Sequence, residues 1–210
     1  MKGFIFDLDG VIVSTDGLHY RAWKQMADNE GIYFDEKINN RLRGVSRMAS
    51  LEIVLERSDR EYSDDEKLAL ATYKNDLYKE LLKSLTPDDI LPGVSEVLKE
   101  LRTRGYKLAI GSSSRNTPAI LKYIGLEGFF DAVSDGNNIT NSKPDPEVFV
   151  KGAQFLGLEC SECYVVEDAK AGIDAGRAGG FTTIALGDAY GYEKADHSIK
   201  DFNEILNIAK

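Results

Sequence analysis

A short apolar run near the N-terminus carries two carboxylates and constrains the fold more than any other part of the chain. Residues 3–11 read GFIFDLDGV, and a run that is apolar on both faces predicts a strand buried in a parallel sheet. Asp7 and Asp9 lie two positions apart, so both face the same side of a strand. Burying them needs a bound cation or a large pKa shift. Asp9-Gly10 is also a hairpin signal, but a hairpin favours an alternating, polar strand before the turn.

The rest of the chain shows two different sequence patterns. Residues 16–85 show helical periodicity without a convincing strand, whereas short apolar strands at 106–111, 132–134, 163–166 and 182–186, with an edge at 197–199, alternate with helices. This pattern predicts an α/β fold with a Rossmann-like parallel sheet covered on both faces. We therefore expect a core domain of residues 1–14 and 86–210, and an all-helical cap domain of residues 15–85 inserted after the first strand.

The composition of the chain limits the classes of partner that it is expected to bind. The chain has 210 residues, 42% of them hydrophobic, and 35 acidic against 26 basic side chains give a net charge of -9. This excess of negative charge argues against nucleic acid or an anionic membrane as the main partner. The sequence has neither a signal peptide pattern nor an apolar run of the roughly 20 residues that a membrane span needs. We expect a cytoplasmic monomer acting on a small molecule.

Reactive side chains follow the predicted strands. In parallel α/β sheets, ligands bind at the carboxyl ends of the strands. Carboxylates at these ends suit Mg²⁺, a hydroxyl and backbone amides can hold phosphate oxygens, and a lysine can balance the charge of a phosphoryl group in transfer. Taken singly, each could be a solvated lysine, a polar strand end or a helix N-cap pair, so the joint occurrence carries the prediction. The residues are Asp7 and Asp9, Ser112 to Ser114, Glu167 and Asp168, and Lys143 in a loop before a helix.

These four positions resemble the four motifs of the haloacid dehalogenase superfamily, whose members are mostly phosphotransferases. The resemblance implies that Asp7 is the nucleophile, which forms an aspartyl phosphate, and that Asp9 is the general acid and base. It further implies that Mg²⁺ is held by Asp7, the backbone carbonyl of Asp9 and Asp168, with Glu167 in support. The implied phosphate-binding residues are Ser112, Ser113, Asn116 and Lys143.

Within the superfamily, the cap resembles the β-phosphoglucomutase-like family. The matching segments are residues 42–47 (LRGVSR), the pair Lys74-Asn75, residues 19–23 (HYRAW) and residues 114–116 (SRN). Arg43 and Ser113 depart from that family, in which lysine is usual and alanine frequent at these places. The implied cap and substrate residues are His19, Trp23, Gly44, Val45, Ser46, Arg47 and Lys74.

That resemblance implies interconversion of β-D-glucose 1-phosphate and glucose 6-phosphate through a bisphosphate. Arg47 would grip the phosphate that is not reacting, and closure of the cap would exclude water. Alternatives for single residues stay open: Arg47 as an exposed arginine at a helix start, His19 as a packing histidine, and Trp23 as cap core. The alternative functions are a Mg²⁺-dependent sugar-phosphate phosphatase and, further away, a non-catalytic protein that binds a phosphorylated metabolite.

Overall fold

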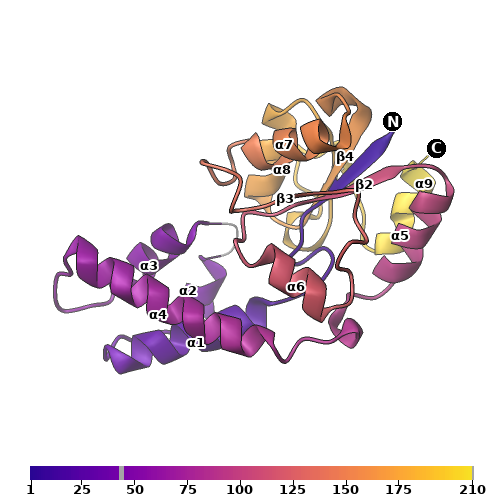
Figure 1. The fold of residues 1–210 in the computed structure, drawn as a ribbon. Coiled ribbons are helices and arrows are strands. Elements are labelled where there is room, and N and C mark those ends of the chain that lie inside the picture. Colours follow the sequence, from indigo (N-terminus) through magenta and orange to yellow (C-terminus); the bar gives the residue numbers. More distant parts are fainter. Residues whose placement is uncertain (43–44, 210) are drawn as a thin grey trace. The chain divides into compact units, whose positions relative to one another are not determined.

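The chain forms two compact units in a computed structural model that describes residues 1–42 and 45–209 (Figure 1). The core unit comprises residues 1–14 and 86–210, and the helical unit comprises residues 15–85. The first strand and the rest of the sheet belong to the core unit, so the helical unit is an insertion that follows the first strand in sequence.

A single parallel sheet organises the core unit. Its strands stand in the order β3-β2-β1-β4-β5-β6, and every neighbouring pair is parallel. The chain order reverses beside β1, which is flanked by β2 and β4, and such a reversal opens a crevice at the carboxyl ends of the strands. The expected α/β fold class is therefore confirmed. The strands are β1 (Gly3–Phe6), β2 (Lys107–Gly111), β3 (Ala132–Ser134), β4 (Cys163–Glu167), β5 (Thr182–Ala185) and β6 (His197–Ser198).

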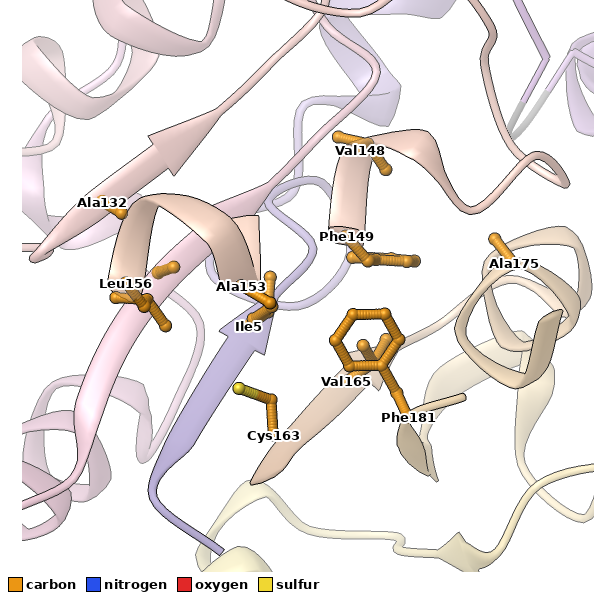
Figure 2. Packing of buried hydrophobic residues seen from close by; sticks show 11 residues of the cluster. Ile5, Ala132, Val148, Phe149, Ala153, Leu156, Cys163, Val165, Ala175 and Phe181 are labelled. Atoms are coloured by element: carbon orange, nitrogen blue, oxygen red, sulfur yellow. The ribbon is translucent and has the colours of Figure 1, made fainter. Parts of the chain in front are cut away.

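Side-chain alternation along the strands builds a hydrophobic layer on each face of the sheet. On one face, Ile5 of β1 and Val165 of β4 pack with Phe149 and Phe181 in a buried cluster (Figure 2). On the other face, the ring of Phe4 stacks on Tyr164, 4.6 Å between centroids. Because strands are apolar on both faces, the sheet needs helices on both.

The helices of the core unit supply that cover. In Figure 1, α7 and α8 lie on one side of the sheet, and α5 and α9 lie on the other. Short 3-10 turns connect several elements, at Pro87–Asp89, Cys160–Glu162, Gly187–Ala189 and Phe202–Glu204. The α-helices are α5 (Val94–Thr103), α6 (Thr117–Tyr123), α7 (Glu147–Leu156), α8 (Lys170–Ala178) and α9 (Ile205–Ile208).

The helical unit is built around the contact between α1 and α4. These helices are α1 (Asp16–Asn29) and α4 (Asp64–Leu82), and α2 (Glu36–Asn40) and α3 (Arg47–Leu55) pack beside them. Trp23, Met26 and Leu51 lie in its buried apolar core. The described residues of this unit contain no strand, in keeping with the helical periodicity of its sequence. Among all described residues, no helix combines the length and the hydropathy that crossing a bilayer requires.

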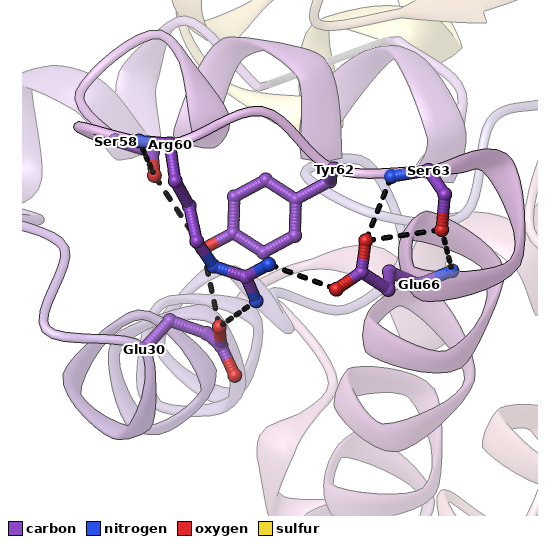
Figure 3. A network of polar contacts seen from close by, with 6 residues as sticks. All are labelled: Glu30, Ser58, Arg60, Tyr62, Ser63 and Glu66. Atoms are coloured by element: carbon purple, nitrogen blue, oxygen red, sulfur yellow. Dashed lines mark hydrogen bonds and ion pairs between the residues drawn. The ribbon is translucent and has the colours of Figure 1, made fainter.

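A polar network secures the loop between α3 and α4 (Figure 3). The guanidinium of Arg60 donates to Glu66 at 2.8 Å and to Glu30 at 3.2 Å, and it stacks on the ring of Tyr62. Ser63 and Glu66 form a capping box at the start of α4, and hydrogen bonds from Arg60 and then from Ser63 lower the pKa of Glu66 to about 2. The network is exposed, so it contributes little to global stability, but it fixes the loop to α4 and to Glu30, the residue that follows α1.

Candidate active site

Asp7 directly follows β1, at the centre of the sheet. Its backbone N–H donates to the carbonyl of Val166 at 2.9 Å, which continues the parallel pairing one residue beyond the strand. Phe6 pairs with Ile110 and with Val166, so the ends of β1, β2 and β4 lie level with one another. The predicted residues Asp7, Ser112 and Glu167, together with Asp168, are thereby placed at one edge of the sheet.

Lys143 bridges two carboxylates at this edge. Its Nζ donates to Asp7 Oδ1 at 2.5 Å and to Glu167 Oε1 at 2.6 Å. Only 4% of the Lys143 side chain is exposed. Burial opposes the charged ammonium, but the negative charges of Asp7 and Glu167 outweigh it and raise the pKa of Lys143. The lysine is therefore a fixed positive charge beside the predicted nucleophile.

Both carboxylate oxygens of Glu167 accept hydrogen bonds from the protein. One carboxylate oxygen accepts from Lys143 and the other accepts from the backbone N–H of Ala169 at 2.7 Å. Burial is the largest influence on this group and raises its pKa, while Lys143 acts in the opposite direction. Both oxygens thus have protein donors, which suits a residue that orients Lys143.

Asp168 lies against the turn that contains Asp9. A Cβ added to Gly10, whose φ is +89°, would stand 2.1 Å from Asp168 Oδ2. Only glycine lets the backbone approach this carboxylate so closely and adopt that conformation. Burial, followed by the negative charges of Glu167, Asp7 and Asp9, raises the pKa of Asp168 to about 8. Lys143 alone does not balance the negative charge collected here.

The residues at this edge fit a bound divalent cation. Several carboxylates but only one lysine, Lys143, act on Asp168, which lies close against Gly10. This edge of the sheet is therefore rich in oxygen atoms and negatively charged, as a divalent cation requires. Within residues 1–42 and 45–209, however, no three His, Cys, Asp or Glu side chains stand close enough to bind a metal by themselves. A cation here would need main-chain oxygen and water in addition, as a ligand set that includes the Asp9 carbonyl provides.

The loop after β2 presents hydroxyls and amides. Ser112 is buried, and its Oγ accepts from the N–H of Ser114 at 3.2 Å. Ser114 Oγ in turn accepts from the N–H of Asn116, the residue that precedes α6, at 3.2 Å. Across the described chain, Ser113 Oγ is the one buried side-chain oxygen or nitrogen without a hydrogen-bond partner. A buried hydroxyl without a partner in the protein can donate a hydrogen bond to an oxygen of a bound ligand.

Two predicted cap residues, His19 and Lys74, are in contact inside the helical unit. His19 stacks on the ring of Tyr78 at 4.0 Å between centroids, and its Nδ1 lies 2.8 Å from Lys74 Nζ. Loss of hydration, followed by the charges of Lys74 and Arg47, lowers the pKa of His19 well below its usual value of 6.5. Arg47 and Lys74 are therefore close enough to His19 for their charges to act on it.

The other predicted cap residues differ in environment. Trp23 is 2% exposed in the core of the helical unit, with Lys74 Nζ 4.6 Å from its ring. Ser46 precedes α3 and its Oγ accepts from the N–H of Ala49 at 3.3 Å, so it is the N-cap of that helix. Val45 is exposed, and Gly44 lies outside the described residues.

Asp135 is a polar strand-end residue that was not among the predicted site residues. It directly follows β3 and is 4% exposed. The signal was available, because a carboxylate after an apolar strand is the pattern that pointed to Asp7 and to Asp168. The pattern was hard to recognise in the sequence, because β3 is short and is followed by a run of loop-forming residues.

A parallel sheet with a buried Asp7–Lys143 pair beside the end of its central strand, and a carboxylate pair at the neighbouring strand, is an α/β architecture suited to holding an anionic phosphoryl group. A family model described as haloacid dehalogenase-like hydrolase matches residues 1–180. The chain belongs to this family.

Relatives within the family carry two kinds of name. The chain is 37% identical to the β-phosphoglucomutase of Bacillus subtilis, over 98% of this chain and 92% of the relative. It is 30% identical to the phosphorylated carbohydrates phosphatase of Thermotoga maritima, over 98% and 90%. The solved structure of β-phosphoglucomutase from Clostridium difficile matches with a TM-score of 0.90 and 36% identity, over 99% of this chain and 96% of that one.

Proposed function

We propose that this protein is a β-phosphoglucomutase, which interconverts β-D-glucose 1-phosphate and glucose 6-phosphate through glucose 1,6-bisphosphate. The observation that carries the proposal is the contact between Lys74 and His19 in the helical unit, where the positive charge of Arg47 also acts on His19. A substrate that carries two phosphates needs cations besides those at the reacting phosphoryl group, and a guanidinium offers paired donors for this. The likeness to the Bacillus subtilis enzyme supports the same choice.

The first transfer starts from the enzyme phosphorylated on Asp7. The Asp9 carboxylate accepts the proton of the sugar 6-hydroxyl, and the sugar oxygen attacks phosphorus. The bond between phosphorus and the Asp7 oxygen breaks, and its electrons return to the Asp7 carboxylate. The products are glucose 1,6-bisphosphate and a protonated Asp9.

The second transfer follows after the bisphosphate has turned around. An Asp7 oxygen attacks the phosphorus on the sugar O1, and the bond between phosphorus and O1 breaks. Asp9 returns its proton to O1, so glucose 6-phosphate leaves and the phosphorylated enzyme is restored. Using one carboxylate as nucleophile twice splits a single difficult displacement into two easier ones.

The electrostatics of the core unit support both steps. Lys143 lies at 2.5 Å from Asp7 and reduces the repulsion between that carboxylate and an anionic phosphoryl group. We propose that Ser112, Ser113 and Asn116 bind the phosphoryl oxygens. Bound Mg²⁺, for which Asp7, the Asp9 carbonyl and Asp168 are the proposed ligands, would neutralise charge on the transferring phosphoryl group. Glu167 would orient Lys143.

The helical unit is proposed to select the acceptor. His19, Arg47, Lys74 and the segment 44–46 would engage the sugar phosphate, and burial of the reaction would keep water from the aspartyl phosphate. Trp23 is proposed to act indirectly, because its ring is covered by the core of the unit and by Lys74. We keep the expectation of a cytoplasmic monomer, which sedimentation of the purified protein and fractionation of cells would test.

The second candidate function is a sugar-phosphate phosphatase. It is favoured by the 30% identity to the phosphorylated carbohydrates phosphatase of Thermotoga maritima. The same aspartyl phosphate would form, but water rather than a sugar hydroxyl would be the acceptor. The buried Asp7–Lys143 pair serves either reaction, so the two functions differ only in the fate of the phosphoryl group.

The test follows both products in one reaction. The protein is incubated with Mg²⁺, β-D-glucose 1-phosphate and a trace of glucose 1,6-bisphosphate, while glucose 6-phosphate and inorganic phosphate are measured. Glucose 6-phosphate forming much faster than phosphate is the expected result. Phosphate release that dominates across many sugar phosphates would assign the phosphatase instead. If neither product forms and an Asp7→Asn variant keeps the biological activity, the protein is a non-catalytic binder.

A further inference from the structure

A buried carboxylate lies outside the roles described so far. Asp135 is 4% exposed at the carboxyl end of β3, and no lysine or arginine of the described chain forms an ion pair with it. An unpaired carboxylate in such a place is costly unless strong hydrogen bonds offset the loss of water. The hydrogen bonds of Asp135 therefore indicate its role.

Both oxygens of Asp135 are used by a single residue. The backbone N–H of Asn137 donates to Oδ1 at 2.8 Å, and its side-chain Nδ2 donates to Oδ2 at 3.2 Å. The same Nδ2 also donates to the backbone carbonyl of Arg115 at 3.0 Å. Asp135 thus determines which way the Asn137 amide points, and the amide then holds the backbone of the loop after β2.

Further hydrogen bonds join the same two loops. Gly136 N–H donates to the carbonyl of Ser114 at 3.2 Å, and Arg115 Nε donates to the carbonyl of Gly136 at 3.1 Å. The backbones approach so closely that a Cβ on Gly136 would stand 2.4 Å from the carbonyl oxygen of Ser113. The loop that carries Ser112 to Asn116 is therefore attached to the end of β3 at several points.

We infer that Asp135 is a positioning residue for the transferring phosphoryl group, and that it acts through Asn137 on the loop of residues 112–116. The inference rests on the proposed function, because that function assigns the phosphoryl oxygens to this loop. Donors aimed at a developing charge are effective only when they are held in place beforehand. The Asp135–Asn137 pair supplies that restraint without touching the substrate.

The chemistry of the pair makes a conservative variant informative. In Asp135→Asn, one acceptor oxygen remains for the Asn137 N–H, but the new NH₂ group faces the NH₂ group of Asn137. Rotation of the Asn137 amide relieves this conflict and removes its donor from Arg115 O. The variant therefore releases the loop even where the buried site itself stays packed.

The main test uses Asn137→Ala, because Asn137 is exposed and its removal leaves the core intact. Asn141→Ala is the matched control: it makes the same chemical change at another exposed position of the loop between β3 and α7. Three readouts are compared: amide hydrogen exchange at Gly136 and Ser112, affinity for inorganic phosphate by calorimetry, and kcat/KM with acetyl phosphate and with glucose 1,6-bisphosphate as phosphoryl donors.

The expected result is a loss of about tenfold in phosphate affinity and in kcat/KM for Asn137→Ala, with faster exchange of both amides. The loss should be equal for the two donors, because the loop is proposed to hold only the phosphoryl group that they share. Asp135→Asn should reproduce it, and Asn141→Ala should match the wild type. The double variant of Asp135 and Asn137 should lose no more than either single variant, since both act through one contact.

Two results would overturn the inference. One is faster amide exchange with unchanged phosphate affinity and turnover, which would make the pair purely structural. The other is a loss confined to the sugar donor, which would place the effect on the sugar. Failure of the proposed function looks different: the wild type would not use glucose 1,6-bisphosphate at all, while phosphate affinity and exchange would still respond to Asn137→Ala.

Discussion

Lys143 shows how one residue can serve both stability and chemistry. It pairs with Asp7 and with Glu167 inside the core unit, at a place where neither carboxylate can be hydrated freely. In such a triad, removing the shared cation leaves two buried negative charges that repel each other. The residue that is proposed to balance the phosphoryl charge is thus also the one that makes burial of the nucleophile possible.

We predict that Lys143→Met destabilises the protein by about 3–5 kcal/mol, because breaking a buried ion pair from one side leaves uncompensated charge. The free energy of unfolding from urea titration measures it. Lys99→Met, at an exposed position of α5, is the control and should change stability little. Adding Glu167→Gln to Lys143→Met should restore part of the loss. A loss below about 1 kcal/mol, with normal turnover, would contradict the role of the triad.

At the scale of elements, the packing of α1 against α4 favours the neutral form of His19. His19 of α1 stacks on Tyr78 of α4 and contacts Lys74 of the same helix, so a proton on the imidazole would be repelled by the positive charges of Lys74 and Arg47. The helical periodicity of residues 16–85 predicted the helices, but this pairing depends on the rotation of each helix about its axis. Only the packed unit determines that rotation.

We predict that the helical unit loses stability as the pH falls below about 6.5, the pKa of an unfolded histidine. The folded pKa of His19 is lowered, so the unfolded state binds the extra proton in this window and the native state does not. The contribution is complete above pH 6.5 and declines toward lower pH, by up to about 1.4 kcal/mol per pH unit. Amide exchange of α1 and α4 between pH 7 and 5.5, corrected for the intrinsic rate, measures it.

Variants of the two histidines separate this effect from general acid destabilisation. His19→Gln should flatten the pH dependence of α1 and α4 between pH 6.5 and 5.5, whereas His197→Gln, at the exposed strand β6, should leave it unchanged. An unchanged slope in His19→Gln would show that another group titrates in this window.

At the scale of the whole molecule, much of the architecture of the core unit could be predicted from the sequence. Buried apolar strands alternating with helices sufficed to predict the parallel sheet, and the rule that ligands bind at strand ends placed Asp7, Ser112 and Asp168 together. The distance of Lys143 from Asp7 could not be predicted, because Lys143 lies in a loop whose path depends on tertiary contacts. The Asp135–Asn137 pair escaped prediction for a related reason: its hydrogen bonds lie between two loops without periodicity.

We predict that Mg²⁺ stabilises the folded protein. If the edge formed by Asp7, Asp9 and Asp168 binds the cation only in the folded state, Mg²⁺ should stabilise the protein by about 2.7 kcal/mol at a hundredfold excess over its Kd. Thermal unfolding with Mg²⁺ and with a chelator measures the difference. Asp168→Asn should abolish the shift, and Asp88→Asn, an exposed carboxylate of the same unit, should retain it. An equal shift in both variants would exclude this edge as the binding place.

A single turnover that follows one labelled phosphoryl group tests whether Asp7 passes its phosphoryl group to the sugar. The protein is phosphorylated with a labelled donor, and peptide mapping verifies that the label is on Asp7. It is then mixed with excess unlabelled β-D-glucose 1-phosphate and quenched. We predict that the label appears in glucose 1,6-bisphosphate before it appears in inorganic phosphate, and that Asp7→Asn carries no label. Label passing directly to inorganic phosphate, at a rate that the sugar does not change, would contradict it.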